Sequence, residues 1–352
     1  MDSLVFRMMD YVAVRGLFDE RSPLLLMLSG GGDSVALLHL LKAAQADVTS
    51  PHCLAAVHIN HQLRGGGADA DEAFCVELCT ALGVSLTVRR LDVADYAQTH
   101  KLNLEDAGRV LRYREAESLL DQLCDQQNVS REQGRIVTAH TRDDRVENFF
   151  MRAIFGSGLG GLAGMAAQRG RIVRPLLDID RSELRDWLKA GGHAWREDPS
   201  NDDESRTRVF IRANIVPEAE KLRPNFRENL ARTMDLVAAD DSLLADMAQG
   251  FARSFSVARN PNESISLDAR MMLTLDPIMA RRVLRVAITQ TFDDASRLDA
   301  AHTLAVLEGL DLLRKLIDDG QKLPPRKVLF ARDIPPALRV KINCDTIEVA
   351  RI

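Results

Sequence analysis

A glycine-rich turn between two apolar segments is the first feature of this sequence that could perform chemistry. In LMLSGGGDSVALLHLL, a short apolar run typical of a buried strand precedes the turn, and apolar residues recur at helical spacing from Ser34 onward. Such a loop directs free backbone N–H groups and the positive end of the helix dipole at an anion. We therefore predict a phosphate-binding loop that consists of Ser29, Gly30, Gly31, Gly32, Asp33 and Ser34.

This loop differs from the Walker and dinucleotide-binding signatures. A Walker loop ends in Gly-Lys-Ser/Thr, yet no lysine follows a glycine in this chain, and SGGGDS lacks the spacing of G-x-G-x-x-G. The serines and the glycine amides suit phosphate, whereas the carboxylate of Asp33 suits Mg2+ better. The alternative is a glycine-rich turn in which Asp33 only caps the helix.

Acidic residues gather in TAHTRDDRVENFF, after the fourth expected strand. If a helix begins near Arg142, Asp143 and Glu147 share one face, and so do Asp144 and Glu147. Carboxylates in this arrangement could hold magnesium or an incoming ammonium group. The alternative is a capped, solvated helix start, where acidic residues are common because of the helix dipole.

Arginines and histidines supply further candidates. In NLEDAGRVLRYREAE, Glu105, Arg109 and Arg112 lie along one helix face, and its arginines could clamp a triphosphate. The alternative there is an ordinary surface ion pair. In VHINHQLRGG, His61 is expected at a strand end beside a nucleotide, while no carboxylate or cysteine at ligand spacing supports a metal on His58 and His61.

A basic strip extends from Arg206 to Arg232, where six arginines and one lysine stand against three glutamates. Its candidates for contact with RNA are Arg206, Arg208 and Arg212. The net charge of −5 argues against a generic cationic nucleic-acid binder, so a nucleic-acid partner requires a local basic surface of this kind. The alternative is a charged face that only meets solvent.

The composition is that of an ordinary globular protein with room for two domains. The chain has 352 residues, of which 46% are hydrophobic and 28% charged. No stretch approaches the roughly 20 apolar residues of a membrane span, and the N-terminus MDSLVFRMMDYV predicts no signal peptide. Five cysteines without a Cys-x-x-Cys pair argue against a zinc ribbon or an iron–sulfur cage and favour free thiols in a reducing cytoplasm.

These candidate residues must be positioned by alternating strands and helices. Strands are expected within residues 22–28, 52–63, 84–93, 134–140 and 171–177, with helices between most of them. This order predicts an α/β, Rossmann-like fold with a parallel five-stranded sheet and a ligand at the carboxyl ends of the strands. The polar clusters described above follow those ends.

Beyond residue 216 the pattern becomes mainly helical. We expect a catalytic domain of residues 1–216 and a helical C-terminal domain of residues 217–352 with a short strand-like tail. Pro217 and Pro224 interrupt the first helical stretch, and DDGQKLPP leads into the tail.

Taken in order, the motifs of residues 20–217 resemble the tRNA(Ile)-lysidine synthetase family of PP-loop ATP pyrophosphatases. The resemblance is carried by Ser29–Ser34, His58–Arg64, Glu105–Tyr113, Ala139–Glu147, Gly161–Met165, Arg174–Leu177 and Glu197–Asn201. Thr141, Arg145, Asn148 and Val209 depart from the residues usual in that family. The acidic residues of the pattern remain, so the family's activity is expected here.

The resemblance implies a ligase that joins L-lysine to the wobble cytidine of the CAU anticodon of tRNA(Ile). ATP, with Mg2+, first adenylates the cytosine O2 and releases pyrophosphate; the lysine amine then expels AMP. The implied catalytic residues are Asp33, Arg109, Arg112, Asp144 and Glu147. ATP binding is implied for the loop Ser29–Ser34 and His61, with Mg2+ on Asp33. The implied contacts with tRNA and lysine are Asp143, Asp144, Glu147, Arg206, Arg208 and Arg212, and the C-terminal domain is expected to bind tRNA.

Two other interpretations stay open. Another PP-loop enzyme, such as a tRNA thiolase or an ammonia-using synthetase, would share the fold. However, many thiolases carry paired cysteines, and an ammonia user would lack the RPLL and DPSN segments seen here. A nucleotide-binding sensor would bind ATP without releasing pyrophosphate. The sequence does not determine the oligomeric state and is compatible with a homodimer.

Overall fold

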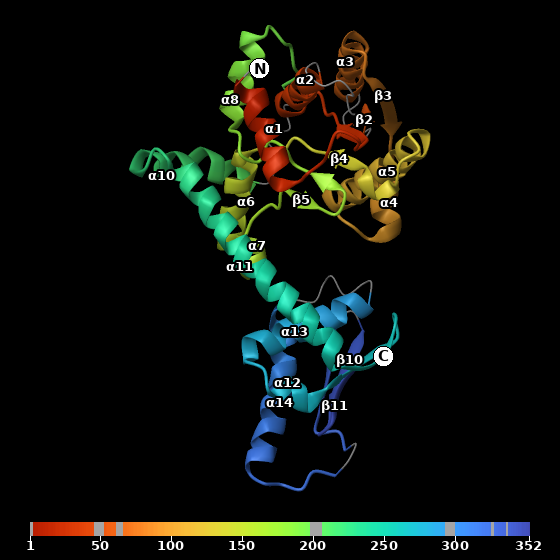
Figure 1. The fold of residues 1–352 in the computed structure, drawn as a ribbon, viewed down its shortest axis with the longest axis vertical. Helices are drawn as coiled ribbons and strands as arrows, with labels where there is room; N and C mark the ends of the chain where they lie inside the picture. Colours follow the sequence, from red (N-terminus) through yellow and green to blue (C-terminus); the bar gives the residue numbers. More distant parts are fainter. Residues whose placement is uncertain are drawn as a thin grey trace. The chain divides into compact units, whose positions relative to one another are not determined.

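The apolar run after Ser22 forms the central strand of a mostly parallel sheet in the computed structural model (Figure 1). The described strands of this sheet are β1 (Leu24–Met27), β2 (Leu54–Asn60), β3 (Ser85–Arg90), β4 (Arg135–Val137), β5 (Gln168–Arg169) and β6 (Ile172–Val173). Their order is β3-β2-β1-β4-β6-β5, and β5 pairs antiparallel with β6. The expected five parallel strands are confirmed, and β5 is a short antiparallel addition to the edge.

The structure describes residues 3–45, 53–60, 66–197, 206–292, 300–324, 327–335 and 337–352. The chain divides into two compact units, the first formed by Met1–Ser157 with Gly161–Asp235 and the second by Gly158–Gly160 with Leu236–Ile352. We expected a domain boundary after residue 216. Compact units describe packing, whereas a domain boundary concerns independent folding, so the expected boundary stays a prediction.

Helices cover both faces of the parallel sheet, as the alternation of strands and helices requires. The described helices of the first unit are α1 (Ser3–Arg15), α2 (Gly32–Gln45), α3 (Gly66–Leu82), α4 (Val93–His100), α5 (Leu104–Gln126), α6 (Arg142–Phe155), α8 (Arg181–Ala190), α9 (Arg206–Phe210) and α10 (Val216–Leu222). Two more, α7 (Leu159–Leu162) and α11 (Phe226–Phe255), have residues in both units. Short turns η1 (Arg131–Gln133) and η3 (Ile211–Ile215) complete the first unit.

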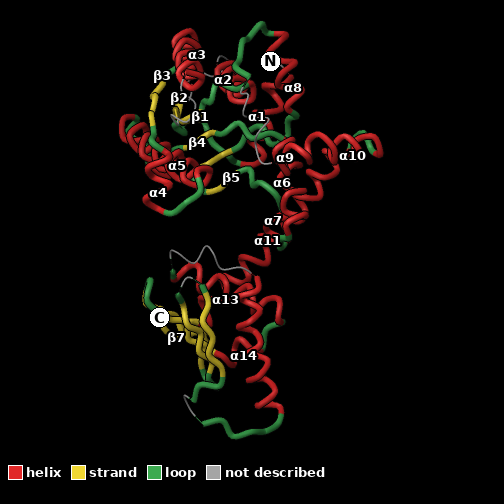
Figure 2. The backbone as a smooth tube through the Cα atoms, turned by 180° about the vertical axis from the view of Figure 1, so that it is seen from behind, coloured by secondary structure: helices red, strands yellow, loops and turns green. Residues whose placement is uncertain are grey.

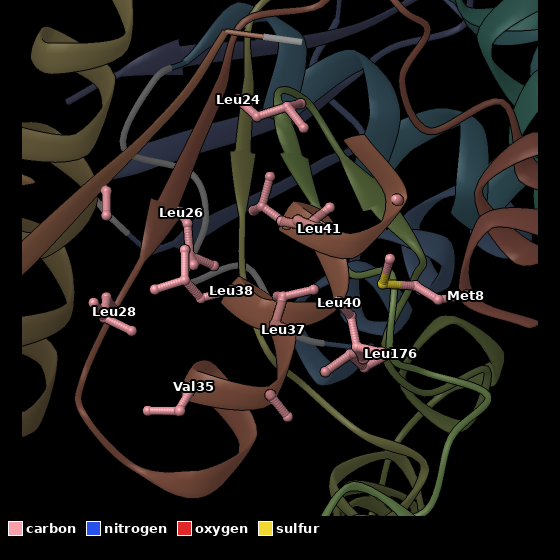
Figure 3. Packing of buried hydrophobic residues seen from close by; sticks show 14 of the residues in the cluster. Met8, Leu24, Leu26, Leu28, Val35, Leu37, Leu38, Leu40, Leu41 and Leu176 are labelled. Atoms are coloured by element: carbon pink, nitrogen blue, oxygen red, sulfur yellow. The ribbon is translucent and has the colours of Figure 1, made fainter. Parts of the chain in front are cut away.

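The alternation of side chains along β1 connects the sheet to both helical layers. Leu24 and Leu26 are fully buried in a cluster with α1, α2, α3 and α8, and Figure 3 shows Leu26 beside Leu38 of α2. Leu25 points the other way and packs with Leu120 of α5. Burying one such leucine side chain stabilises a fold by roughly 1.5–3 kcal/mol, so this core fixes the loop that follows β1.

The second unit contains an antiparallel sheet backed by helices (Figure 2). Its described strands are β7 (Ser256–Asn260), β8 (Ser264–Asp268), β9 (Phe330–Ile334), β10 (Leu338–Ile342) and β11 (Thr346–Arg351), in the order β7-β8-β11-β10-β9. The helices that complete its core are α12 (Ala269–Leu273), α13 (Pro277–Thr291) and α14 (Ala300–Asp318). No helix in the described part of the chain is both long and apolar enough to cross a membrane.

The expectation of a mainly helical C-terminal domain was therefore wrong in part. The tail does form strands, but β7 and β8 join them from a segment for which no strand was expected. The reason is that one face of this sheet is covered and the other meets solvent, so β7 is almost wholly exposed and only two residues of β8 are buried. Five-residue strands with this pattern carry a weak sequence signal.

Candidate active site

The loop after β1 is held closed by its own two serines. The Ser34 hydroxyl accepts a hydrogen bond from the Ser29 N–H at 3.2 Å and donates one to the Gly31 carbonyl at 2.9 Å. The two hydroxyl oxygens lie 3.0 Å apart. Gly30 has a φ of +89°, and a Cβ there would lie 3.3 Å from Cys75 Sγ, so glycine is required at this position. α2 begins at Gly32, which gives the strand, loop and helix order that suits an anion.

A second segment lies along this loop. The Arg196 N–H donates to the Gly30 carbonyl at 2.9 Å, and a Cβ on Gly32 would lie 3.3 Å from the Trp195 ring. Glu197 accepts hydrogen bonds from Trp195 Nε1 and from Arg185, both at 3.0 Å. The Asp-Pro-Ser-Asn motif that follows Glu197 lies outside the described residues.

Asp33 faces α8 from the first turn of α2. Its Oδ2 accepts a hydrogen bond from Arg181 Nε at 2.9 Å, while its Oδ1 is buried and has no hydrogen-bond partner in the described structure. Burial raises the pKa of the Asp33 carboxyl, because the charged form loses hydration, although the Arg181 guanidinium opposes this shift. A buried, half-satisfied carboxylate beside a phosphate-type loop is suited to hold a cation.

Arg181 brings the loop and the acidic cluster together. Its guanidinium lies 2.9 Å from Asp144 Oδ1 and 3.8 Å from Glu147 Oε1, in addition to the contact with Asp33. Its backbone N–H donates to Asp143 Oδ2 at 2.8 Å. The carboxylates expected on α6, Asp143 and Asp144 each paired with Glu147, therefore meet Asp33 at the start of α8.

Each carboxylate of α6 already has donors. Asp144 Oδ2 accepts from the Thr141 N–H at 2.7 Å and from the Thr141 hydroxyl at 2.9 Å, so the helix-capping alternative applies to this one oxygen. Asp143 pairs with Arg227. Glu147 is buried, with a side chain only 3% exposed, and both of its oxygens accept from Arg212, at 2.7 and 3.2 Å. The acidic cluster is thus internally neutralised.

The basic strip contributes to this cluster. Arg212 binds Glu147, and Arg208 Nε lies 3.9 Å from Glu147 Oε2. These two candidates for contact with RNA therefore lie at the acidic site, which their sequence positions did not predict. The side chain of Arg206 and the whole of His61 lie outside the described residues.

A second group of charges surrounds His140, which follows β4. His140 Nδ1 lies 2.9 Å from the Thr138 hydroxyl. Burial lowers the pKa of His140 to about 4, so the ring is neutral at neutral pH. The charged side chains that act on it are Asp144, Arg109, Arg174 and Arg208. The group therefore connects α5 with the acidic site.

The predicted arginines of α5 lie at the surface of the first unit. Arg109 and Arg112 are both exposed, and Arg109 acts electrostatically on His140 and on the buried Arg174. Arg112 is near Glu105, the third candidate of that helix face. Exposed cations beside the carboxyl edge of the sheet are available to a large anion.

Sequence reasoning missed Arg181, His140 and Arg174 as site residues. His140 and Arg174 stand inside motifs that were noticed, Ala139–Glu147 and Arg174–Leu177, so their positions beside strand ends could have indicated them. Arg181 offers one weak local signal, since it begins a helix whose N-cap is Asp180. Its four acidic partners are visible only in the fold.

A protein-only metal centre is not assembled here. No group of three or more His, Cys, Asp or Glu side chains with metal-binding geometry occurs among the described residues. In the glycine-rich loop, the unpartnered Oδ1 of Asp33 fits a magnesium ion. A magnesium ion commonly binds one or two carboxylates together with substrate phosphates, so one free carboxylate oxygen beside a phosphate loop is compatible with it.

One departure from the family pattern has a structural explanation. Arg145, where glutamine is usual, is buried, and its guanidinium lies 2.7 Å from Asp235 Oδ1. Asp235 also accepts from Arg15 of α1, at 2.7 Å. The ion pairs join α1, α6 and α11 within the first unit, so Arg145 serves packing.

Comparisons with known proteins agree with this geometry. The PP-loop domain family matches residues 7–219. A tRNA(Ile)-lysidine synthase of Parabacteroides distasonis is 36% identical over 233 residues, which are 66% of this chain and 50% of that protein. The corresponding synthase of Geobacter sulfurreducens is 32% identical over 313 residues, 87% of this chain and 63% of that protein. The chain thus spans between half and two thirds of the length of these relatives.

Among solved structures, the fold is similar to that of a U34-tRNA thiolase from Methanococcus maripaludis with its [4Fe-4S] cluster. The TM-score is 0.51 at 18% identity, and the match covers 67% of this chain and 78% of that chain. At this identity the likeness concerns the fold alone. It agrees with the parallel sheet and the loop after β1 described above.

Proposed function

The chain belongs to the PP-loop domain family, and from that premise we propose that it is an ATP-dependent ligase that joins lysine to tRNA(Ile). The bond forms at the wobble cytidine of the CAU anticodon, as in the tRNA(Ile)-lysidine synthases that the chain is similar to. The observation that supports this proposal most is the meeting of Asp33, Asp144 and Glu147 at Arg181, because a loop that suits phosphate and carboxylates that suit an amine lie together there.

The loop Ser29–Ser34 would hold the phosphates of ATP through its serine hydroxyls and backbone N–H groups. Oδ1 of Asp33 would hold Mg2+ together with those phosphates, and the ion would neutralise phosphate charge. Arg109 and Arg112 of α5 and His61 would lie along the nucleotide. Arg174 is buried and would support them without direct contact with solvent.

In the first step, the cytosine O2 attacks the α-phosphorus of ATP, and pyrophosphate leaves. Cationic side chains such as Arg109 would stabilise the negative charge that develops on the phosphate oxygens. In the second step, the ε-ammonium of lysine loses a proton, the neutral amine attacks the ring carbon that carries the adenylated oxygen, and AMP leaves. The target base would enter the site from a single-stranded anticodon loop, where it can be unstacked.

Asp144 and Glu147 would bind and orient the lysine amine, and Asp143 would support them through its contacts with the Arg181 N–H and with Arg227. Two arginines of the strip, Arg208 and Arg212, would set the charge around Glu147. With Arg206, they also lie on the sequence expected to face RNA. The protein would work in the cytoplasm, where tRNA is found, and the proposed homodimer stays a separate prediction.

Mass spectrometry of nucleosides tests the proposal. The protein is incubated with ATP, Mg2+, isotope-labelled lysine and a tRNA(Ile) transcript with a CAU anticodon, and the tRNA is then digested. We expect a labelled lysidine nucleoside and equal amounts of pyrophosphate and AMP. Pyrophosphate release without lysidine would favour another PP-loop tRNA-modifying enzyme, whereas ATP binding without pyrophosphate release would favour a nucleotide-binding sensor.

A further inference from the structure

Arg181 stands at the point where the loop, α6 and α8 meet. Its three guanidinium nitrogens face three different carboxylates: Nε lies 2.9 Å from Asp33 Oδ2, one terminal nitrogen 2.9 Å from Asp144 Oδ1, and the other 3.8 Å from Glu147 Oε1. The Arg181 side chain is only 19% exposed. A planar fork of this kind links groups in different elements, which a single ammonium group does less well.

One of these nitrogens occupies an oxygen that the second substrate needs. Mg2+ would bind Oδ1 of Asp33, which Arg181 leaves open, whereas the lysine ammonium would require Asp144 and Glu147. Oδ2 of Asp144 is already committed to Thr141, so Oδ1, which Arg181 binds, is the oxygen left for an ammonium group. The lysine ammonium and Arg181 therefore compete for Oδ1 of Asp144.

A triphosphate offers Arg181 an alternative partner. Guanidinium groups bind phosphate oxygens through two parallel hydrogen bonds, and the nucleotide phosphates would lie beside Asp33. If Arg181 moved to the phosphates, Asp33 would have both oxygens available and Asp144 would have Oδ1 available. Glu147 would keep Arg212 as its partner, so this buried carboxylate would not be left uncompensated.

We propose that Arg181 is a positioning residue that couples the two substrate sites: it holds Asp33, Asp144 and Glu147 before nucleotide binds, and it transfers to the phosphates when ATP binds. The acceptor on Asp144 is then open to the lysine ammonium, so ATP binding strengthens lysine binding. This inference rests on the proposed function for the identity of the second substrate. By reciprocity, lysine strengthens nucleotide binding by the same factor.

Calorimetric titration of L-lysine into the full chain tests the coupling. The dissociation constant of lysine is measured without nucleotide and with saturating Mg2+ and α,β-methylene ATP, which cannot release pyrophosphate. In the wild-type protein we expect the analogue to tighten lysine binding by about tenfold or more, which corresponds to about 1.4 kcal/mol. In Arg181→Ala we expect this ratio to fall to near one.

Arg181→Lys and Arg7→Ala complete the design. The Arg181→Lys variant keeps the positive charge without the planar fork. It should therefore fold even where Arg181→Ala does not, and it should give an intermediate ratio of the two lysine dissociation constants. Arg7 also binds a carboxylate of α8, Glu183, but lies outside the site, so Arg7→Ala should keep the wild-type ratio.

The inference is overturned if the wild-type protein gives a ratio of one. It is also overturned if folded Arg181→Ala or Arg181→Lys keeps the ratio of the wild-type protein. Lysidine formation by the wild-type protein is measured beside these titrations. If the wild-type protein forms lysidine but the ratio does not depend on residue 181, the coupling is wrong and the proposed function stands. If it forms no lysidine, the proposed function itself fails.

Discussion

At the scale of single residues, the Asp33 side chain accepts a hydrogen bond from Arg181 and would also hold Mg2+. One substitution can separate these two roles. Asp33→Asn keeps the size of the side chain but removes the charge that would hold Mg2+. We expect pyrophosphate release to fall by about a hundredfold or more, or about 2.7 kcal/mol in the activation barrier. The melting temperature should change little, because burial already disfavours the charged carboxylate. Full pyrophosphate release at saturating Mg2+ would refute the assignment of the loop.

Asp144 shows how a helix cap and a substrate ligand can be told apart. Asp144→Asn removes the charge on Oδ1 that faces Arg181, and we expect lysidine formation to fall by tenfold or more, about 1.4 kcal/mol. Thr141→Ala is the matched control, because it removes only the hydroxyl that donates to Oδ2. It should cost about 1 kcal/mol of stability with little loss of activity. Equal activity losses in the two variants would mean that Asp144 acts only as a cap.

At the scale of elements, the sequence predicts what depends on near neighbours. The helix start near Arg142 that the acidic pattern assumed is observed, and Thr141 and Asp144, three residues apart, form a capping pair there. The partners of the acidic residues were not predicted, because Arg181 reaches Asp144 across 37 residues and Arg212 reaches Glu147 across 65. Contacts of this length depend on the packing of α8 and η3, which no local pattern reports.

The packing of α2 on α8 makes stability depend on pH. His39 of α2 stacks on His193, which follows α8, with ring centroids 3.8 Å apart, and Trp187 lies beside both. Burial, with the neighbouring His193, lowers the pKa of His39 from 6.5 to about 4. Between these values the unfolded chain binds a proton that the folded chain does not, so stability is full above about pH 6.5 and falls toward pH 4.

His39→Gln removes this titration. We expect the free energy of unfolding of the variant to depend less on pH than that of the wild-type protein over this range, as measured by urea denaturation at several pH values. At pH values above the range, the variant should be the less stable of the two because it loses the ring stack. Parallel curves for the two proteins would show that His39 does not contribute to the acid sensitivity.

At the scale of the whole molecule, the two sheets differ in how far sequence could predict them. The parallel sheet is buried on both faces, so Leu24, Leu25 and Leu26 form a continuous apolar run that marks β1 clearly. The antiparallel sheet is covered on one face only, and β7 has four exposed residues out of five. Such a strand resembles a polar loop in sequence.

The last prediction concerns how a chain with a net charge of −5 meets RNA. Several cations of the basic strip are committed inside the protein, since Arg212 binds Glu147 and Arg227 binds Asp143 and Glu220. Arg223 and Arg232 are exposed, and Arg232 lies 3.9 Å from Glu228, a long contact for an ion pair. Phosphate contacts in this part of the strip should therefore come from Arg223 and Arg232.

The variant Arg223→Ala/Arg232→Ala should weaken tRNA binding and reduce its salt dependence. Each lost phosphate contact removes about 0.7 from the slope of log affinity against log salt on single strands and about 0.9 on a duplex. The matched control is Arg131→Ala, which removes an exposed arginine paired with Asp125 before β4, at the amino end of the parallel strands. Filter binding at several salt concentrations gives the slopes, and titration with ATP shows that the nucleotide site is intact. A slope that stays at the wild-type value in the double variant would place the RNA-binding surface elsewhere on the chain.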